Sequence, residues 1–296
     1  KANPSIPMQA TPRTSPHADT KQASHLSEGP ADHAQERMIK EPSSEGLVLE
    51  KYTPEELFKT YNQMVHFVKA FDSSGEDART VAQGSGVAIS PRLLITNHHV
   101  VQGSDVVLST NIPVRDITSD NEIFFWIVIK ADKDRDLALL QLVSEEKSAS
   151  LPHVSGFSPM HDLSVGQSVW AIGAPAGLEK TFSEGIISGF RDSHDLGISL
   201  SASVSYIQNT AQISPGSSGG ALFDSYGNLI GIPTFYRENA QGLNFALTMD
   251  ELAAFLQDFK QEIDQNKNLT SHEKQPKAES EKVFRTRYRS PLEGLQ

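Results

Sequence analysis

Short apolar runs fill the chain between residues 81 and 246, and they constrain its fold more than any other feature. The runs are β-branched or aliphatic and are separated by Gly, Pro, Ser, Asn and Asp. This pattern is typical of strands joined by tight turns, and some dozen of them suit an all-β fold of two six-stranded antiparallel barrels. The expected strands are residues 86–90, 93–96, 105–108, 122–131, 137–142, 168–172, 182–190, 197–201, 206–210, 221–223, 229–235 and 242–246.

A helix is expected ahead of these strands. Thr53 is a good N-cap, Pro54 suits the first helical position, and Glu56 completes a capping box. The segment 64–71 that follows is β-prone and predicts a first strand, although a longer helix through Val68 fits the helical period nearly as well.

A second helix is expected to close the fold at residues 250–263. Thr248 and Glu251 have the spacing of a capping box at its start. Apolar residues recur at helical spacing and predict a buried stripe of Leu252, Phe255, Leu256 and Phe259.

Composition divides the chain into three parts, with the folded domain at residues 51–263. Residues 1–50 are rich in Pro, Ser, Ala, His and Glu and have little aliphatic clustering, so we expect a disordered leader. Residues 264–296 are polar and are expected to form a loose, solvated tail. Within that tail the segment 284–289, FRTRYR, alternates basic and aromatic residues, which leaves a docking motif as the alternative.

Charge and cysteine content exclude several classes of function. The net charge of −11 argues against a general nucleic-acid or anionic-membrane binder, since both need a basic surface. No apolar run reaches the roughly 18 residues of a spanning helix. The absence of cysteine excludes disulfides, Cys-ligated zinc and thiol catalysis.

The sequence GSSGG at residues 216–220 supplies a candidate nucleophile. Glycines on both sides of Ser218 would let the backbone turn sharply and present amide hydrogens beside the hydroxyl. The amides of Gly216 and Ser218 are the candidate oxyanion donors. A plain Gly-Ser turn is the alternative reading of the motif taken alone.

The sequence TNHHVV at residues 96–101 supplies a candidate base. On an extended backbone the side chains of His98 and His99 would point to opposite faces, so at most one can be catalytic. The same geometry argues against a metal pair, because neighbouring strand residues do not chelate one ion.

Asp136 is the candidate acid that orients the base. It begins the apolar run DLALLQL, where a buried carboxylate is costly unless an imidazole or another donor pairs with it. The rival reading is a calcium loop, since Asp132, Asp134 and Asp136 match its first positions. That loop needs Gly and Glu where this chain has Leu137 and Val143, which argues against calcium.

These segments resemble the trypsin-like, chymotrypsin-fold serine peptidases, and most closely the HtrA/Deg-type proteases. The resemblance covers roughly residues 81–252 and implies two perpendicular six-stranded barrels with a Ser-His-Asp triad between them. The matching blocks, in family order, are GSGVAIS, LLITNHHVV, DLALLQL, AIGAPAGL, SEGIISG, IQNTAQISPGSSGGALF, GNLIGI and LNFAL.

The resemblance implies a role for each candidate. The family's catalytic histidine precedes VV, which selects His99, with Asp136 orienting it and Ser218 attacking. The amides of Gly216 and Ser218 would bind the oxyanion, and no metal or cofactor is implied. His98 departs from the pattern, because the family usually has a small residue there; we expect it to point to solvent.

The family pattern also indicates the substrate pocket. Gln212, Ile213, Thr234 and Phe235 would shape it, and Gln212 stands where trypsin-type enzymes have the Asp that selects Arg or Lys. A small or medium apolar side chain is therefore expected at the cleavage site. Ser217 replaces the Asp on which zymogen activation by cleavage depends, so that activation is not expected.

The expected function is a serine endopeptidase acting on protein or peptide substrates. A glutamyl-endopeptidase-like enzyme is the second enzyme reading, and a protease-like peptide-binding or chaperone module is the alternative from another class. We expect a monomer rather than a trimer, no PDZ domain after residue 263, no nucleic-acid partner and no membrane span. Family habit and a first residue other than Met favour a periplasmic or secreted location.

Overall fold

The computed structural model describes residues 50–75, 77–119, 122–143, 151–174, 180–237 and 242–267, all within one unit of the chain, Leu49–Gln296. The expected leader up to residue 49 lies outside this description. So does the tail beyond residue 267, including the segment 284–289.

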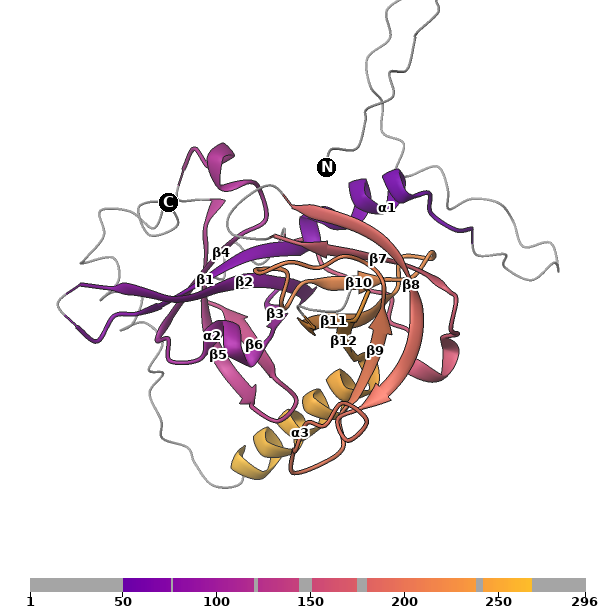
Figure 1. The fold of residues 1–296 in the computed structure, drawn as a ribbon. Helices are drawn as coiled ribbons and strands as arrows, with labels where there is room; N and C mark the ends of the chain where they lie inside the picture. The colour runs from indigo at the N-terminus through magenta and orange to yellow at the C-terminus, as the bar shows by residue number, and fades with distance from the viewer. Residues whose placement is uncertain are drawn as a thin grey trace, which may run out of the picture. The chain divides into compact units, whose positions relative to one another are not determined.

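Six antiparallel strands close into a first barrel, in the order β1-β2-β3-β6-β5-β4 (Figure 1). Closure pairs every strand on both sides, so the barrel has no free edge. The strands are β1 (Val65–Asp72), β2 (Arg79–Ser90), β3 (Leu93–Thr96), β4 (Val106–Thr110), β5 (Phe124–Asp132) and β6 (Leu137–Leu142).

A second closed barrel follows, in the order β10-β11-β12-β9-β8-β7. The expected all-β fold of two six-stranded barrels with a C-terminal helix is therefore confirmed. The strands are β7 (Ser168–Gly173), β8 (Thr181–Asp192), β9 (Ser205–Asn209), β10 (Ala221–Phe223), β11 (Leu229–Tyr236) and β12 (Asn244–Thr248).

Two details of the strand prediction come out differently. The expected strand at residues 197–201 is wrong, because this segment bonds within its own turn: Gly197, with φ of 70°, donates to the His194 carbonyl, and Ile198 donates to that of Ser193. The twelfth strand is instead β1, which settles the ambiguity at residues 64–71 in favour of a strand.

Helix α1 (Pro54–Tyr61) begins with the expected capping box. The Glu56 amide donates to Thr53 Oγ1 at 3.3 Å, and the Thr53 amide donates to Glu56 Oε2 at 3.1 Å. Leu57 is fully buried, and the Tyr61 ring packs on Phe223 of the second barrel with centroids 4.8 Å apart. The short 3₁₀ helix η2 (Asn62–Met64) then leads into β1.

Helix α3 (Met249–Lys267) follows β12 and is longer than the expected 250–263. Its stripe is confirmed: Leu252 and Phe255 are buried, with Leu256 and Phe259 partly so. Only half of the expected capping box forms. The Glu251 amide donates to the Thr248 hydroxyl at 3.4 Å, but the Glu251 carboxylate bonds elsewhere.

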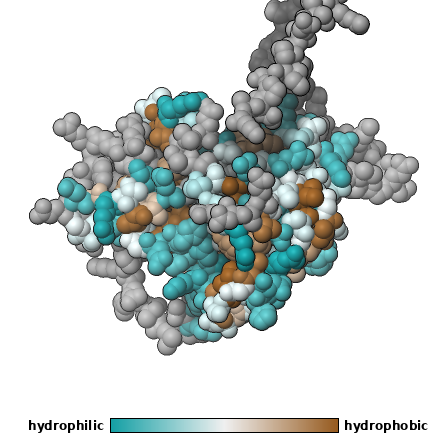
Figure 2. Space-filling model, in the orientation of Figure 1, coloured by the Kyte–Doolittle hydropathy of each residue, from teal (hydrophilic) through white to brown (hydrophobic). Residues whose placement is uncertain are grey.

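The largest apolar cluster contains residues of both barrels. It joins Val65, Val87, Ile95, Leu137 and Leu139 of the first barrel to residues of the second and to the buried residues of α1 and α3. On the face drawn in Figure 2, hydrophobic residues appear as patches between hydrophilic ones. Because the apolar cluster contains residues of both barrels, packing within it fixes where the loops of the two barrels meet.

Among the described helices, none has the length and apolar character needed to cross a membrane.

Replacing Leu57 with alanine is expected to lower the free energy of unfolding by about 2–4 kcal/mol, because it empties a buried site between α1 and the second barrel. The matched control is Val165→Ala at a side chain that is 62% exposed, where less than about 0.5 kcal/mol is expected. Urea denaturation measures both. A Leu57→Ala protein as stable as the parent would show that α1 does not pack as described.

Candidate active site

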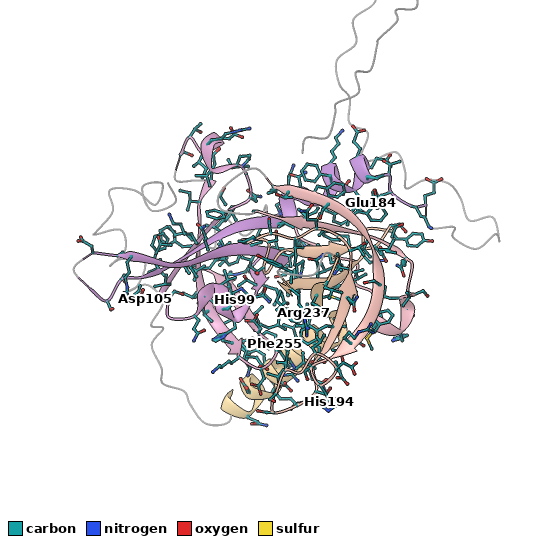
Figure 3. All side chains as sticks on the ribbon, in the orientation of Figure 1. His99, Asp105, Glu184, His194, Arg237 and Phe255 are labelled. Carbon is teal, nitrogen blue, oxygen red and sulfur yellow. The ribbon has the colours of Figure 1, made fainter. Side chains whose placement is uncertain are left out.

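His99 and Asp136 form the closest pair of candidate residues. His99, labelled in Figure 3, lies on α2 (His98–Val101), a short helix directly after β3. Its Nδ1 lies 2.7 Å from Asp136 Oδ2, and its backbone amide donates to Asp136 Oδ1 at 2.9 Å. An ionised carboxylate only accepts hydrogen bonds, so in a neutral His99 ring this contact assigns the proton to Nδ1 and the lone pair to Nε2. The pair thus has the geometry of a base held by its orienting acid.

Asp136 has an unusual backbone. It ends the turn between β5 and β6 with φ of 53°, and no other non-glycine residue in the described part of the chain has a positive φ. Such a conformation costs on the order of 1 kcal/mol. Its carbonyl accepts from the His98 amide at 3.1 Å and from Asn97 Nδ2 at 2.9 Å, and these bonds hold the strained turn.

The adjacent histidines do not lie on an extended backbone, so that expectation is wrong. Both are in α2, where successive side chains diverge by about 100°. The ring of His99 meets Asp136, whereas His98 meets that residue through its backbone amide and is half-buried rather than fully exposed to solvent.

Ser218 lies in the loop between β9 and β10, after a tight turn. The Ser217 amide donates to the Ser214 carbonyl at 2.9 Å, and Gly216 has φ of 95°, which together with Pro215 makes a type II turn. The Ser218 hydroxyl donates to the Thr234 carbonyl at 3.2 Å rather than to His99. The candidate nucleophile and the candidate base are therefore not joined by a hydrogen bond in this structure.

Ser85 of β2 connects the nucleophile loop to the first barrel, a role that the sequence analysis missed. Its amide donates to the Ser218 carbonyl at 2.8 Å, and its hydroxyl donates to the Gly216 carbonyl at 2.7 Å. The hydroxyl also accepts from the Ala174 amide at 2.8 Å, and the Ser85 carbonyl accepts from Thr96 Oγ1 at 2.6 Å. The carbonyls of Gly216 and Ser218 are thus both hydrogen-bonded to Ser85 of β2. The amides of Gly216 and Ser218 donate to no described residue.

Asn97 makes a second link that the sequence analysis missed. Its buried Nδ2 donates to the Asp136 carbonyl at 2.9 Å and to Thr234 Oγ1 at 3.2 Å. Because the Thr234 carbonyl receives the Ser218 hydroxyl, one amide joins the turn of Asp136 to the strand beside the candidate nucleophile. Its position beside the two histidines was the only available signal.

Gly219 allows the loop to approach β2 this closely. It has φ of 84°, and a Cβ atom there would lie 2.3 Å from the Ser85 carbonyl oxygen and 2.4 Å from Thr96 Oγ1. No side chain fits that space, so the first G of the GG pair is required by packing as well as by its backbone conformation.

Two of the expected pocket residues precede the nucleophile. Gln212 is exposed, and its carbonyl accepts the Ser183 hydroxyl of β8 at 2.6 Å. Ile213 is half-buried and packs against the apolar cluster of the second barrel. Neither is hydrogen-bonded to Ser218, and only Ile213 offers apolar surface.

The other two expected pocket residues lie on β11. The Thr234 hydroxyl is turned inward, where it donates to the Ile232 carbonyl at 2.9 Å and accepts from Asn97. Only its backbone carbonyl meets Ser218. Phe235 is half-buried and stacks on Phe245 with ring centroids 4.9 Å apart.

Asp132, the first of the candidate calcium ligands, stabilises the turn between β5 and β6 instead. The Asp132 carboxylate accepts from the amides of Asp134 at 2.9 Å and Arg135 at 3.0 Å, and from the Arg135 guanidinium at 2.8 Å. Burial raises the pKa of Asp132, but these hydrogen bonds outweigh burial and lower it overall. A carboxylate so engaged is not preorganised for a cation.

A second group of possible metal ligands lies at the end of β8 and in the turn after it, at Asp192, His194 and Asp195, with His194 labelled in Figure 3. The two carboxylates cap each other's backbone amides, at 2.8 and 3.3 Å. That arrangement explains the cluster without an ion.

Comparison with known proteins gives one consistent set of matches. The trypsin-like peptidase domain family matches residues 84–232. The putative serine protease HhoA of Synechocystis is 35% identical over 190 residues, covering 64% of this chain and 45% of that protein. The serine protease Do-like HtrA of Bacillus subtilis is 29% identical over 195 residues, covering 63% and 41%. The chain thus spans less than half the length of these relatives.

Among solved structures, the HtrA-type protease AlgW with a decapeptide is similar. It superposes with a TM-score of 0.58 at 25% identity, covering 71% of this chain and 68% of the other.

Replacing Gly219 with alanine is expected to cost more than about 3 kcal/mol of folding free energy, because an unfavourable φ and a clash with the Ser85 carbonyl add together. The matched control is Gly103→Ala, with φ of 77° but no atom within 4 Å of the new Cβ, where about 1 kcal/mol is expected. Denaturant midpoints compare the two. Equal losses would contradict the close approach of the loop to β2.

Proposed function

We propose, because this chain belongs to the trypsin-like peptidase family, that it is a serine endopeptidase hydrolysing protein substrates through Ser218, His99 and Asp136. The observation that carries the proposal is the contact of both Asp136 oxygens with one residue, His99. This contact fixes the ring position and the tautomer that a general base needs.

In the proposed reaction the Ser218 hydroxyl rotates from the Thr234 carbonyl to His99 Nε2. The ring takes the hydroxyl proton as the oxygen attacks the peptide carbonyl, and Asp136 stabilises the imidazolium that forms. The imidazolium then gives its proton to the leaving amine. Water hydrolyses the acyl-enzyme by the same proton route in reverse.

The amides of Gly216 and Ser218 are proposed to bind the oxyanion. The type II turn and the two carbonyls held by Ser85 support this role, since they leave both amides without a described partner. One oxyanion donor contributes about 10²–10³ in kcat in serine proteases of other folds.

For the substrate we propose an extended, accessible protein segment with a small or medium apolar side chain at the cleavage site. The pocket would be shaped by Gln212, Ile213, Thr234 and Phe235. The half-buried apolar surfaces of Ile213 and Phe235 support this preference, and no acidic side chain is among the four.

For assembly and location we propose a monomer that works in the periplasm or after secretion. The one fully buried side chain of α1, Leu57, lies in the apolar cluster shared by the two barrels of its own chain, which leaves less of that helix for contacts between copies. Some relatives are named as periplasmic proteases, for example in Haemophilus influenzae, although others are chloroplastic.

One observation favours a second candidate function. The Ser218 hydroxyl bonds to the Thr234 carbonyl, so the nucleophile is not hydrogen-bonded to its base. A protease-like module that binds extended peptide with little turnover would have such a resting site.

A fluorophosphonate probe with intact-mass detection separates the two functions. We expect one label per chain on Ser218, lost in Ser218→Ala and in His99→Ala. His98→Ala is the matched control and should keep the label, because only the backbone amide of His98, not its ring, is hydrogen-bonded to Asp136. No labelling of the folded parent protein would favour the binding module.

Ser85→Ala tests the proposed oxyanion site. The Gly216 carbonyl would lose its hydroxyl donor, so the turn is expected to loosen and kcat to fall about 10-fold or more with KM little changed. Ser104→Ala is the matched control, since that hydroxyl bonds only within its own turn, to the Val101 carbonyl. Hydrolysis of a fluorophore-labelled unfolded protein gives both constants. A kcat within twofold of the parent for Ser85→Ala would contradict the role.

A further inference from the structure

We propose that Arg135 is a positioning residue for this reaction and that helix α3 holds Asp136 in place through it. The inference rests on the proposed function and deepens it, since it assigns the setting of the acid to a helix outside both barrels. Arg135 directly precedes Asp136 in the turn between β5 and β6.

The Arg135 guanidinium binds three carboxylates. Nη1 donates to Asp132 Oδ2 at 2.8 Å and to Asp258 Oδ2 at 3.0 Å, and Nε donates to Glu251 Oε2 at 3.2 Å. Asp132 belongs to β5, whereas Glu251 and Asp258 belong to α3. The planar guanidinium has donors in fixed directions, so it defines an orientation that a lysine ammonium would not.

Glu251 carries the connection further. Its other oxygen accepts from the Ser205 amide at 2.9 Å, at the start of β9, and its side chain is only 13% exposed. The next residue, Tyr206, is buried, and burial together with the charges of Asp136 and Glu251 raises its pKa to about 12. The charges of Asp136 and Glu251 therefore both disfavour ionisation of the Tyr206 hydroxyl. The turn, α3 and β9 form a single charged and hydrogen-bonded unit.

The strained backbone of Asp136 connects this unit to the proposed reaction. A residue with φ of 53° keeps that conformation only when its surroundings impose it. The ion pairs of Arg135 hold the backbone directly before Asp136, while Asn97 and the His98 amide hold the Asp136 carbonyl. If the guanidinium is removed, the turn can relax and both contacts of the Asp136 carboxylate with His99 are displaced.

A purely stabilising ion pair is the competing explanation, and the structure offers a matched control for it. Lys130 of β5 pairs with Glu262 of α3, and the lysine side chain is 18% exposed against 24% for Arg135. Both cations attach α3 to the first barrel, but Lys130 is outside the turn that carries Asp136.

The first experiment measures kcat and KM for Arg135→Met and Lys130→Met with a fluorogenic peptide. We expect Arg135→Met to lower kcat about 10-fold at nearly unchanged KM, since small displacements of a reacting group have effects of this order or larger. Lys130→Met should stay within twofold of the parent. Arg135→Lys should restore only part of kcat. Equal losses in the two Met variants, or an unchanged kcat in a folded Arg135→Met protein, would overturn the proposal.

A second readout does not depend on turnover. In a Ser218→Ala background, the low-field proton resonance of the His99 Nδ1–H reports its bond to Asp136. Adding Arg135→Met should shift or broaden this resonance, and adding Lys130→Met should leave it in place. A resonance unchanged by both would overturn the role of Arg135. If the parent protein fails to turn over while the resonance responds as expected, the proposed function fails and the positioning role stands.

Asp258→Asn covers the case in which Arg135→Met does not fold. Asp258 is about half exposed, and this variant removes one limb of the contact while Asp132 and Glu251 remain. We expect a decrease in kcat of about threefold and the same direction of change in the His99 resonance. No change in either would count against the proposal.

Discussion

The hydrogen bonds of Ser85 are the constraint on which the site depends most. They join β2 of the first barrel to the nucleophile loop of the second, across a separation of 131 residues in sequence. The loop can come this close only because Gly219 has no side chain. The largest apolar cluster contains residues of both barrels and packs them together. The polar contacts of Ser85 and Asn97 then fix the register of one barrel against the other.

This arrangement divides the proposed triad into a rigid part and a movable part. His99 and Asp136 are joined by two hydrogen bonds, a strained turn and, through Arg135, the helix α3. Ser218 has a fixed backbone but a hydroxyl that bonds to the Thr234 carbonyl. In the proposed reaction this hydroxyl leaves the Thr234 carbonyl and bonds to His99 instead.

The sequence predicted the parts of the fold that local rules govern. The α1 capping box, the stripe of α3 and most strands follow from the spacing of apolar and capping residues. Its errors have local causes too: residues 197–201 turn back on themselves, and the histidines lie on a one-turn helix. Ser85, Asn97 and Arg135 had no assigned role, because each has a decisive partner 116 to 137 residues away in the chain: Gly216, Thr234 and Glu251. The Glu251 carboxylate shows the same effect, since it bonds to the distant Arg135 and Ser205 instead of completing the capping box of α3.

The most direct test of the account is a crystal structure of the protein with a peptide boronic acid, which mimics the tetrahedral intermediate. The account predicts a bond from boron to Ser218 Oγ, now rotated away from Thr234. One boronate oxygen should lie within hydrogen-bond distance of the Gly216 and Ser218 amides, with His99 Nε2 near the other. An adduct whose oxygen points away from both amides, or a peptide bound with Ser218 still on the Thr234 carbonyl, would contradict it.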